Sequence, residues 1–591
     1  MNNRRMGTYS KGKAKDFKGT IRKLGSYLYR FRHLLILALL LTIASSALAL
    51  LNPYLTGKIL GEIQKGADID FSIIYHYAIL MFIFYFSSAI LSLLINILMI
   101  RISKKIVYSM RKDAFNKLIK LKISYFDNNL TGDVISRLTY DIDTVNTSLS
   151  TDVIQIITSI ITVIGSLIMM IIISPILVSV FAITIPLSIL FVQIMVKKTS
   201  KFFKKRSEEL GKMNGFTEEM ITGEHTIMAY AKADNIINDF DEYNKNASDA
   251  CYKAEYYSSF TGPGVTFVNN LSLALICLFG AILSKRSIIG IEEIGSFILY
   301  SRRFSGPINE IANIVTDLQS SVAAAERVFN LIDSEEETAD IDTAKQITVG
   351  DVSFNHVYFG YNKDKLILED ISFTALKGKR IAIVGPTGSG KTTIVNLLMR
   401  FYDINNGSIL INNIPHDNLK KDSLRKNFAM VLQDTWLFTG SIYDNLVYGN
   451  NNVSKEKVVE TCKLCHIDTF INNLPNGYDT IITESGINMS KGERQLLTIA
   501  RAMLLENDML ILDEATSNVD TRTEMLVQDF LNLLMNNKTC FIIAHRLSTI
   551  KNCDLILVIK DGKLIEQGSH EELMAQGGFY YELQSSKNVN I

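Results

Sequence analysis

Residues 380–393 read Arg-Ile-Ala-Ile-Val-Gly-Pro-Thr-Gly-Ser-Gly-Lys-Thr-Thr. The apolar run before the first glycine predicts a buried strand, and residues 394–401 predict a helix. A GxxxxGK[ST] loop between a strand and a helix is typical of phosphate binding, because backbone N–H groups and the helix N-terminus both attract phosphate oxygens. We therefore expect an α/β P-loop domain whose nucleotide-binding residues are Gly385, Pro386, Thr387, Gly388, Ser389, Gly390, Lys391, Thr392 and Thr393.

A second apolar strand, residues 508–512, ends in two acids, Asp513 and Glu514. Carboxylates at the C-terminal end of a parallel strand lie beside the phosphate loop. We expect Asp513 and the Thr392 hydroxyl to hold Mg²⁺, Lys391 to reach the β and γ phosphates, and Glu514 to polarise the attacking water as general base. Two solvated acids are the alternative, but the strand is too apolar to lie at a sheet edge.

The rest of the composition is that of a membrane protein. Of 591 residues 48% are hydrophobic, the mean hydropathy is +0.17, and the net charge is only +1. This balance provides no global field for nucleic acid, and six scattered cysteines exclude a disulfide-stapled secreted protein. Charge-free runs cover residues 34–57, 71–100, 153–196 and 260–284. The third is about twice the ~20 residues of one membrane helix, so Ser174-Pro175 is expected to divide it into two helices.

A sixth span, residues 288–314, is weaker because it contains Glu292, Glu293, Arg302 and Arg303. Topology favours it. Residues 1–33 carry ten Lys or Arg against one acid, so the N-terminus should be cytoplasmic. A nucleotide-binding C-terminal part must be cytoplasmic too, and two cytoplasmic ends need an even number of crossings.

The two basic segments between spans, residues 101–152 and 197–259, predict helical extensions into the cytoplasm. Each has one interruption, at residues 126–132 and 223–225, which is either a tip that presses on the soluble domain or an ordinary helix–helix turn. We expect a basic N-terminus (1–33), a six-helix transmembrane domain (34–332), a linker (333–346) and a nucleotide-binding domain (347–591).

Residues 489–493, Met-Ser-Lys-Gly-Glu, precede an apolar helix and complete a resemblance. With the phosphate loop, Gln433 in Val-Leu-Gln-Asp, Asp513-Glu514, residues 517–520 and His545 in Ile-Ala-His-Arg, the chain resembles a half-size ATP-binding cassette exporter of the multidrug type. This resemblance covers almost the whole chain. It implies a helical bundle followed by a P-loop ATPase domain with a helical signature subdomain, in a bacterial plasma membrane.

The resemblance also implies residue roles. Tyr361 resembles the aromatic that stacks on adenine, in preference to Tyr358. Gln433 resembles the residue that links Mg²⁺ and lytic water to the membrane domain, and His545 the switch histidine at the γ-phosphate. Ser490 and Gly492 resemble signature groups that bind ATP held by the opposite subunit. The tips near residues 126–132 and 223–225 resemble coupling helices.

The signature departs from the usual Leu-Ser-Gly-Gly-Gln, since Lys491 replaces a glycine and Glu493 a glutamine. A carboxylate near another subunit's triphosphate should weaken closure by ~1 kcal/mol or more. An altered signature beside an intact Glu514 resembles one half of a heterodimeric bacterial exporter. We favour that assembly, and a homodimer is the alternative.

The expected function is ATP-driven export of hydrophobic or amphipathic compounds, with ATP and Mg²⁺ as cofactors and a second half-transporter as partner. The alternatives are a lipid flippase or peptide exporter, and, less favoured, a nucleotide-gated regulator. Cys462, Cys465 and His466 match a haem-attachment pattern, but core cysteines are the expected reading. His76 is expected to be a satisfied interhelical histidine. The sequence leaves open whether Arg302 and Arg303 contact substrate or lipid.

Overall fold

The computed structural model describes residues 15–341, 343–347, 350–362, 365–432, 435–450, 452–483, 489–513, 521–543 and 547–588. The described chain forms two compact units. The first comprises Met1–Leu121 and Asn128–Glu336, and the second comprises Lys122–Asp127 and Glu337–Ile591. The short segment Lys122–Asp127 therefore packs with the second unit although it is flanked in sequence by the first.

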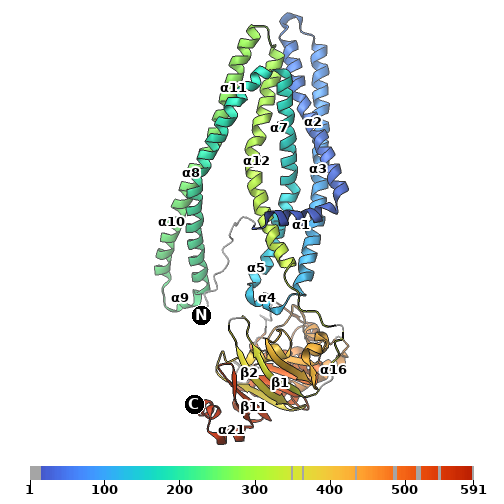
Figure 1. The fold of residues 1–591 in the computed structure, drawn as a ribbon, viewed down its shortest axis with the longest axis vertical. Coiled ribbons are helices and arrows are strands. Elements are labelled where there is room, and N and C mark those ends of the chain that lie inside the picture. The colour runs from blue at the N-terminus through green and yellow to red at the C-terminus, as the bar shows by residue number, and fades with distance from the viewer. Residues whose placement is uncertain are drawn as a thin grey trace. The chain divides into compact units, whose positions relative to one another are not determined.

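Long helices make up the first unit (Figure 1). Five helical segments are long and apolar enough to cross a membrane: Arg32–Ile63, Phe71–Leu118, Thr131–Ile173, Pro175–Thr222 and Ala233–Lys285. The helices are α1 (Phe17–Tyr29), α2 (Arg32–Ile63), α3 (Phe71–Leu118), α5 (Thr131–Ser136), α6 (Ile142–Thr147), α7 (Val153–Ile173), α8 (Pro175–Thr222), α9 (Glu224–Ala229), α10 (Ala233–Ser259), α11 (Thr261–Lys285) and α12 (Ile291–Ile332). Helix α12 packs against α2 and α7. It covers most of the expected sixth span, residues 288–314, which is not among these five segments.

The expected break in the third apolar run is present. Ser174 is extended (φ −157°, ψ 101°) between α7 and α8, and its hydroxyl accepts the Leu177 N–H at 3.4 Å. Pro175 stands at the start of α8, where a missing N–H costs nothing. The run therefore forms two helices, as predicted. By contrast, the interhelical position expected for His76 is wrong, because its side chain is exposed early in α3.

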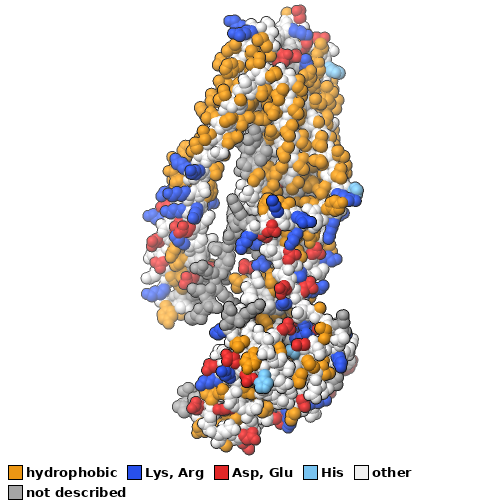
Figure 2. All heavy atoms as spheres, in the orientation of Figure 1, with side chains coloured by type: hydrophobic (Ala, Val, Ile, Leu, Met, Phe, Trp, Pro, Cys, Tyr) orange, Lys and Arg blue, Asp and Glu red, His pale blue; other side chains and the backbone are white. Residues whose placement is uncertain are grey.

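Beyond the apolar region, α8 and α10 run side by side and meet at the short helix α9 (Figure 1). Stacked rings join them: Phe202 on Tyr257, with centroids 4.3 Å apart, and Phe216 on Tyr243 at 4.7 Å. Figure 2 shows orange apolar side chains over the upper part of this unit and blue and red charged ones over the α8–α10 extension. The surface thus changes from lipid-compatible to water-compatible along the same helices.

An ion pair fixes the C-terminal part of α12. Arg327 donates to both carboxylate oxygens of Asp141, at 2.9 and 2.5 Å. Asp141 is only 2% exposed and lies in a turn of π-helix, Arg137–Asp141, between α5 and α6. This pair ties the segment after the first tip to α12.

A six-stranded sheet forms the core of the second unit, in the order β12-β11-β3-β10-β9-β6. Its strands are parallel except for β12, which pairs antiparallel with β11. A four-stranded sheet has the order β2-β1-β4-β5, and β7 pairs with β8. The strands are β1 (Val352–Phe359), β2 (Leu368–Ala375), β3 (Arg380–Val384), β4 (Asn406–Ile411), β5 (Ile414–Pro415), β6 (Phe428–Val431), β7 (Gly440–Ser441), β8 (Ile481–Ile482), β9 (Met509–Asp513), β10 (Thr539–Ile543), β11 (Leu555–Lys560) and β12 (Lys563–Gly568).

Helices cover the central sheet, whose strands β3, β9 and β10 are almost wholly buried. That burial explains why these strands read as continuous apolar runs rather than alternating ones. The helices are α4 (Ile123–Asn128), α13 (Lys391–Leu398), α14 (Lys421–Lys426), α15 (Ile442–Leu446), α16 (Lys455–Leu464), α17 (Asp468–Asn472), α18 (Lys491–Leu504), α19 (Thr521–Leu534), α20 (Leu547–Lys551), α21 (His570–Gln576) and α22 (Phe579–Asn588). The expected order of a helical membrane region and an α/β domain is confirmed.

Candidate functional site

The phosphate loop has the expected form. Strand β3 ends at Val384, residues 385–390 form the loop, and α13 begins at Lys391. A side chain on Gly385 would place its Cβ 2.0 Å from the Ile559 carbonyl oxygen, and Gly390 has φ +103° at the N-cap of α13. Only glycine fits both positions without strain, so the sequence motif and the backbone geometry agree.

Two side chains of this loop are poised for an anion. The Lys391 ammonium donates to the carbonyls of Gly385 (3.0 Å) and Pro386 (2.9 Å), which hold it across the loop. The buried Ser389 hydroxyl has no hydrogen-bond partner among the described residues. Buried polar groups are normally paired, so a cation with a replaceable set of acceptors and an unpaired hydroxyl fit a phosphate group entering the loop.

Asp513 lies at the same edge of the sheet as the loop. In the parallel register, Ile543 of β10 is level with both Ile383 of β3 and Asp513 of β9. Asp513 is therefore two strands, roughly 10 Å, from the strand that enters the loop. Thr392 is exposed in the first turn of α13. A hydroxyl and a carboxylate are hard oxygen ligands of the kind Mg²⁺ prefers, and their placement fits a metal bound beside the phosphates.

Three of the expected site residues, Gln433, Glu514 and His545, lie outside the described residues. Of the described residues, Asp513 ends β9 and Ile543 ends β10, and both strands end at the edge of the sheet where the phosphate loop lies.

Tyr361 is held beside the loop by its hydroxyl, which is 3.2 Å from Thr393 Oγ1 and 3.3 Å from Asn396 Nδ2, both on α13. Two more rings make edge-to-face contacts with it, Phe359 at 5.0 Å and Tyr402 at 4.9 Å between centroids. The Tyr361 side chain is 46% exposed. Part of its ring is thus free to stack on a planar group next to the phosphate site.

The signature segment starts helix α18. Ser490 is the N-cap, and its hydroxyl accepts the Glu493 N–H at 3.2 Å, while the Glu493 carboxylate accepts the Ser490 N–H at 2.8 Å. This reciprocal arrangement is a capping box. This role of Glu493 was not among the expectations, which concerned only its charge toward a second subunit, although serine followed three residues later by glutamate is the pattern that identifies it. Gly492 is buried in the first turn and Lys491 is exposed.

The linker makes ion pairs that the sequence analysis did not identify. Arg425 donates to both carboxylate oxygens of Glu337, at 3.1 and 2.5 Å, and Lys421 donates to the Thr338 carbonyl. Burial alone would raise the pKa of Glu337, but the hydrogen bond and charge of Arg425, with the charge of Lys421, outweigh it and lower that pKa. The cluster of acidic residues after α12 is the sequence pattern that could have indicated these ion pairs.

The first tip also contributes a contact inside the second unit. Asp127, at the end of α4, accepts a hydrogen bond from the Tyr402 hydroxyl. Burial and this bond to a carboxylate raise the pKa of Tyr402. The second tip, α9, follows Gly223 as expected.

The haem-like cysteine pattern belongs to the core, as expected. Cys462 and Cys465 are completely buried, and Cys465 lies 3.4 Å from the sulfur of Met503. Burial raises the pKa of these thiols to about 11 and about 12 respectively. Both are therefore protonated packing groups at neutral pH.

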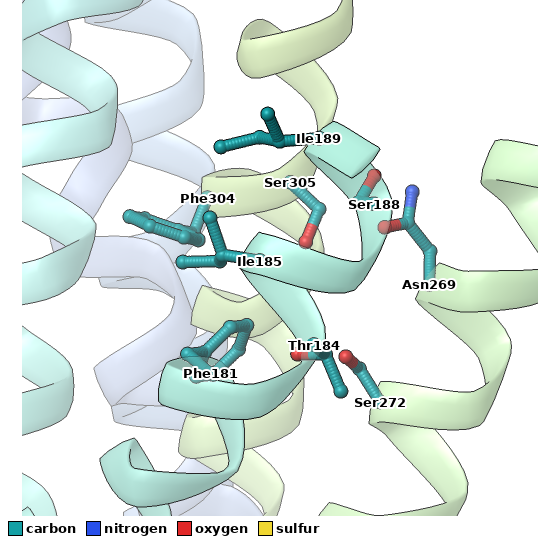
Figure 3. Close-up of a pocket in the computed structure, with 9 residues that line it drawn as sticks. All are labelled: Phe181, Thr184, Ile185, Ser188, Ile189, Asn269, Ser272, Phe304 and Ser305. Carbon is teal, nitrogen blue, oxygen red and sulfur yellow. The ribbon is translucent and has the colours of Figure 1, made fainter. Parts of the chain in front are cut away.

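A separate small pocket lies within the membrane unit, among α8, α11 and α12 (Figure 3). Hydroxyl and amide groups face aromatic and aliphatic ones, and Phe181 and Phe304 form its wall with rings 5.3 Å apart. Its volume of about 30 Å³ admits little more than one water-sized group. None of the lining residues is charged: Phe181, Thr184, Ile185, Ser188, Ile189, Asn269, Ser272, Phe304 and Ser305.

Two family models match the chain, the ABC transporter transmembrane region over residues 35–308 and the ABC transporter family over residues 368–517. An uncharacterised ABC transporter ATP-binding protein of Bacillus subtilis, YfiC, is 40% identical over 98% of this chain and 96% of its own. A fatty acid ABC transporter ATP-binding/permease protein of Mycobacterium bovis is 37% identical over 88% and 83%.

Among solved structures, a bacterial Atm1-family ABC exporter with ATP bound has a TM-score of 0.77 and 26% identity, covering 94% of this chain and 98% of its own.

Proposed function

The chain belongs to the ABC transporter family as a half-size exporter, and from that premise we propose that it exports hydrophobic or amphipathic compounds with Glu514 as general base. It is a multi-pass bacterial membrane protein whose ATPase domain is cytoplasmic and couples ATP hydrolysis to transport. The observation that carries the catalytic proposal is the alignment of the phosphate loop and Asp513 at one sheet edge.

The proposed chemistry assigns each group one task. Lys391 leaves its loop carbonyls to bind the β and γ phosphates, and the N–H groups of the loop with the start of α13 bind the remaining phosphate oxygens. Thr392, Gln433 and Asp513 would hold Mg²⁺, which when bound neutralises phosphate charge. Glu514 takes the proton of the attacking water, His545 contacts the γ-phosphate, and Tyr361 stacks on adenine.

The test of the general base is Glu514→Gln in the full-length chain reconstituted in lipid. We expect Mg²⁺-ATP hydrolysis to fall about 10²- to 10⁴-fold, with nucleotide binding retained. Glu506→Gln is the matched control, because Glu506 is an exposed acid of the same unit, paired with Lys457. A Glu514→Gln variant that keeps most of its hydrolysis rate would overturn the assignment.

A half-size chain must dimerise to complete an ATP site, and we favour a heterodimer. The Glu493 carboxylate lies on the N–H of Ser490, a group expected to approach the other subunit's triphosphate. A negative charge there opposes nucleotide, so the site formed by residues 489–493 would be the weaker one. The stronger site would pair Lys391, Asp513 and Glu514 with a partner's signature.

The assembly is tested by the mass and hydrolysis rate of the chain purified alone in lipid. A heterodimer predicts little turnover until a second half-transporter is added. A stable homodimer with vigorous, Glu514-dependent hydrolysis would contradict it and would show that Met-Ser-Lys-Gly-Glu is a working signature.

For the substrate, we favour a neutral amphipathic compound. The membrane pocket is too small to hold one, but its uncharged lining offers hydroxyl and amide groups to a neutral compound that passes between α8, α11 and α12. A fatty acid or lipid is the second candidate, supported by the fatty acid transporter of Mycobacterium bovis. The two candidates are distinguished by comparing how strongly neutral amphipathic dyes and fatty acids stimulate ATP hydrolysis. We expect Asn269→Leu to reduce stimulation by the true substrate, whereas Asn270→Leu, at an exposed neighbouring position, should leave it unchanged.

A further inference from the structure

A chain of contacts connects the proposed adenine-stacking ring with the first cytoplasmic tip, entirely within the second unit. Tyr361 meets Tyr402 edge to face, with centroids 4.9 Å apart and planes at 85°. Phe359 packs against both rings, at 5.0 and 5.7 Å. At the far end of Tyr402, its hydroxyl donates to the Asp127 carboxylate.

Each end of this chain of contacts is fixed to a different element. Tyr361 is held to α13, the helix that starts at Lys391, through Thr393 and Asn396. Asp127 belongs to α4, a helix of six residues with no buried side chain. The Tyr402 side chain lies between them, half-buried, with its ring against Tyr361 and its hydroxyl on Asp127 of α4.

We propose that Tyr402 is a positioning residue that transmits occupancy of the nucleotide's base site to the helix α4. A base stacked on Tyr361 restricts that ring, and the edge contact then restricts Tyr402. A restricted Tyr402 keeps its hydroxyl on Asp127, and a hydrogen bond to a charged acceptor is stronger than one between neutral groups. Helix α4 thus becomes more ordered when a base is present and not merely when phosphates are bound. This inference rests on the proposed role of Tyr361.

The experiment is hydrogen exchange of the full-length chain in lipid nanodiscs, with peptides covering residues 122–128 and 385–393. Two ligands are compared in the presence of Mg²⁺: a non-hydrolysable ATP analogue and inorganic triphosphate, which has no base. We expect both ligands to slow exchange at residues 385–393, but only the analogue to slow it at residues 122–128.

The decisive variant is Tyr402→Phe, which keeps the ring contact and removes the hydroxyl. The analogue should still slow exchange at residues 385–393, while its effect at residues 122–128 falls about tenfold, the usual size of one hydrogen bond to a charged group. Asp127→Ala should have the same effect by a separate route, and the double variant should be no worse than either alone. Tyr581→Phe, which changes an exposed side chain on α22, is the control.

Equal slowing by triphosphate at residues 122–128, or an undiminished effect in Tyr402→Phe, would overturn the inference. Failure of the proposed function would look different. In that case the analogue would not slow exchange at residues 385–393 even in the natural protein, and the inference would fall with it. If both single variants lose the slowed exchange at residues 122–128 but keep it at residues 385–393, Tyr402 connects the base site with α4.

Discussion

The central sheet of the nucleotide-binding unit and the long helices of the membrane unit are built from the same apolar residue types but place them oppositely. Ile381, Ile383 and Ile511 are completely buried, whereas Ile172 is 70% and Phe82 is 69% exposed. In the sheet, apolar residues create a protein interior. In the helices they face lipid, where apolar contact gives no force between helices. Polar contacts therefore matter differently in the two units.

In the nucleotide-binding unit, polar groups gather at one sheet edge and serve a ligand. In the membrane unit, they serve mostly to hold helices together, as the Asp141–Arg327 pair does. Removing a polar group at the sheet edge should thus abolish chemistry, whereas removing one that holds elements together should loosen structure. The following substitutions test that contrast.

The largest effect is expected at Lys391. Lys391→Ala removes the cation of the phosphate loop, and we expect ATP hydrolysis to drop at least ~100-fold, the usual cost of losing one charge-stabilising donor, with little change in thermal stability. Lys377→Ala, at an exposed position of the same unit, should keep full activity. Hydrolysis by the Lys391→Ala variant at near the natural rate would refute the proposed phosphate site.

An intermediate effect is expected at Asp141. Asp141→Ala leaves Arg327 without its bidentate partner, and we expect a loss of about 2 kcal/mol in unfolding free energy, below the value for a fully buried pair because Arg327 is 40% exposed. The control is Asp143→Ala, two residues along the chain from Asp141, which breaks an exposed pair with Arg111. It should cost under about 1 kcal/mol of unfolding free energy. Thermal unfolding in nanodiscs measures both, and equal losses would contradict the structural role.

The smallest effect is a pH dependence from Glu337. Its pKa is lowered below the ordinary 4.5 when the linker docks, so the pair with Arg425 stabilises the unit above that pH and the contribution is lost as the pH falls through the folded value. We expect the free energy of unfolding of the natural protein to exceed that of Glu337→Gln by about 1 kcal/mol at pH 7. The difference between the two should shrink below pH 4.5. Glu369→Gln, which breaks an exposed pair with Lys563, is the control and should cost less free energy of unfolding at pH 7.

The fold was predictable because the sequence contains two strong patterns. These are apolar runs long enough to cross a membrane and a glycine loop between a strand and a helix. Ser174-Pro175 was predictable since proline and a capping serine have local meaning. The Tyr402–Asp127 bond was not predictable, because its partners are far apart in the chain and neither has a distinctive neighbourhood. The same holds for Arg327 and Asp141. His76 was misjudged because hydropathy does not show which side of a helix faces its neighbours.

The depth of the cysteines has a practical consequence. All four thiols of the nucleotide-binding unit, Cys462, Cys465, Cys540 and Cys553, are buried, whereas Cys277 is exposed on α11 and Cys251 is half-buried on α10. A maleimide reagent should therefore label the folded protein on its membrane unit alone. An engineered surface cysteine could then carry a single spectroscopic probe on the ATPase, with every natural thiol of that unit kept in place. For the same reason, mild oxidants should leave ATP turnover intact.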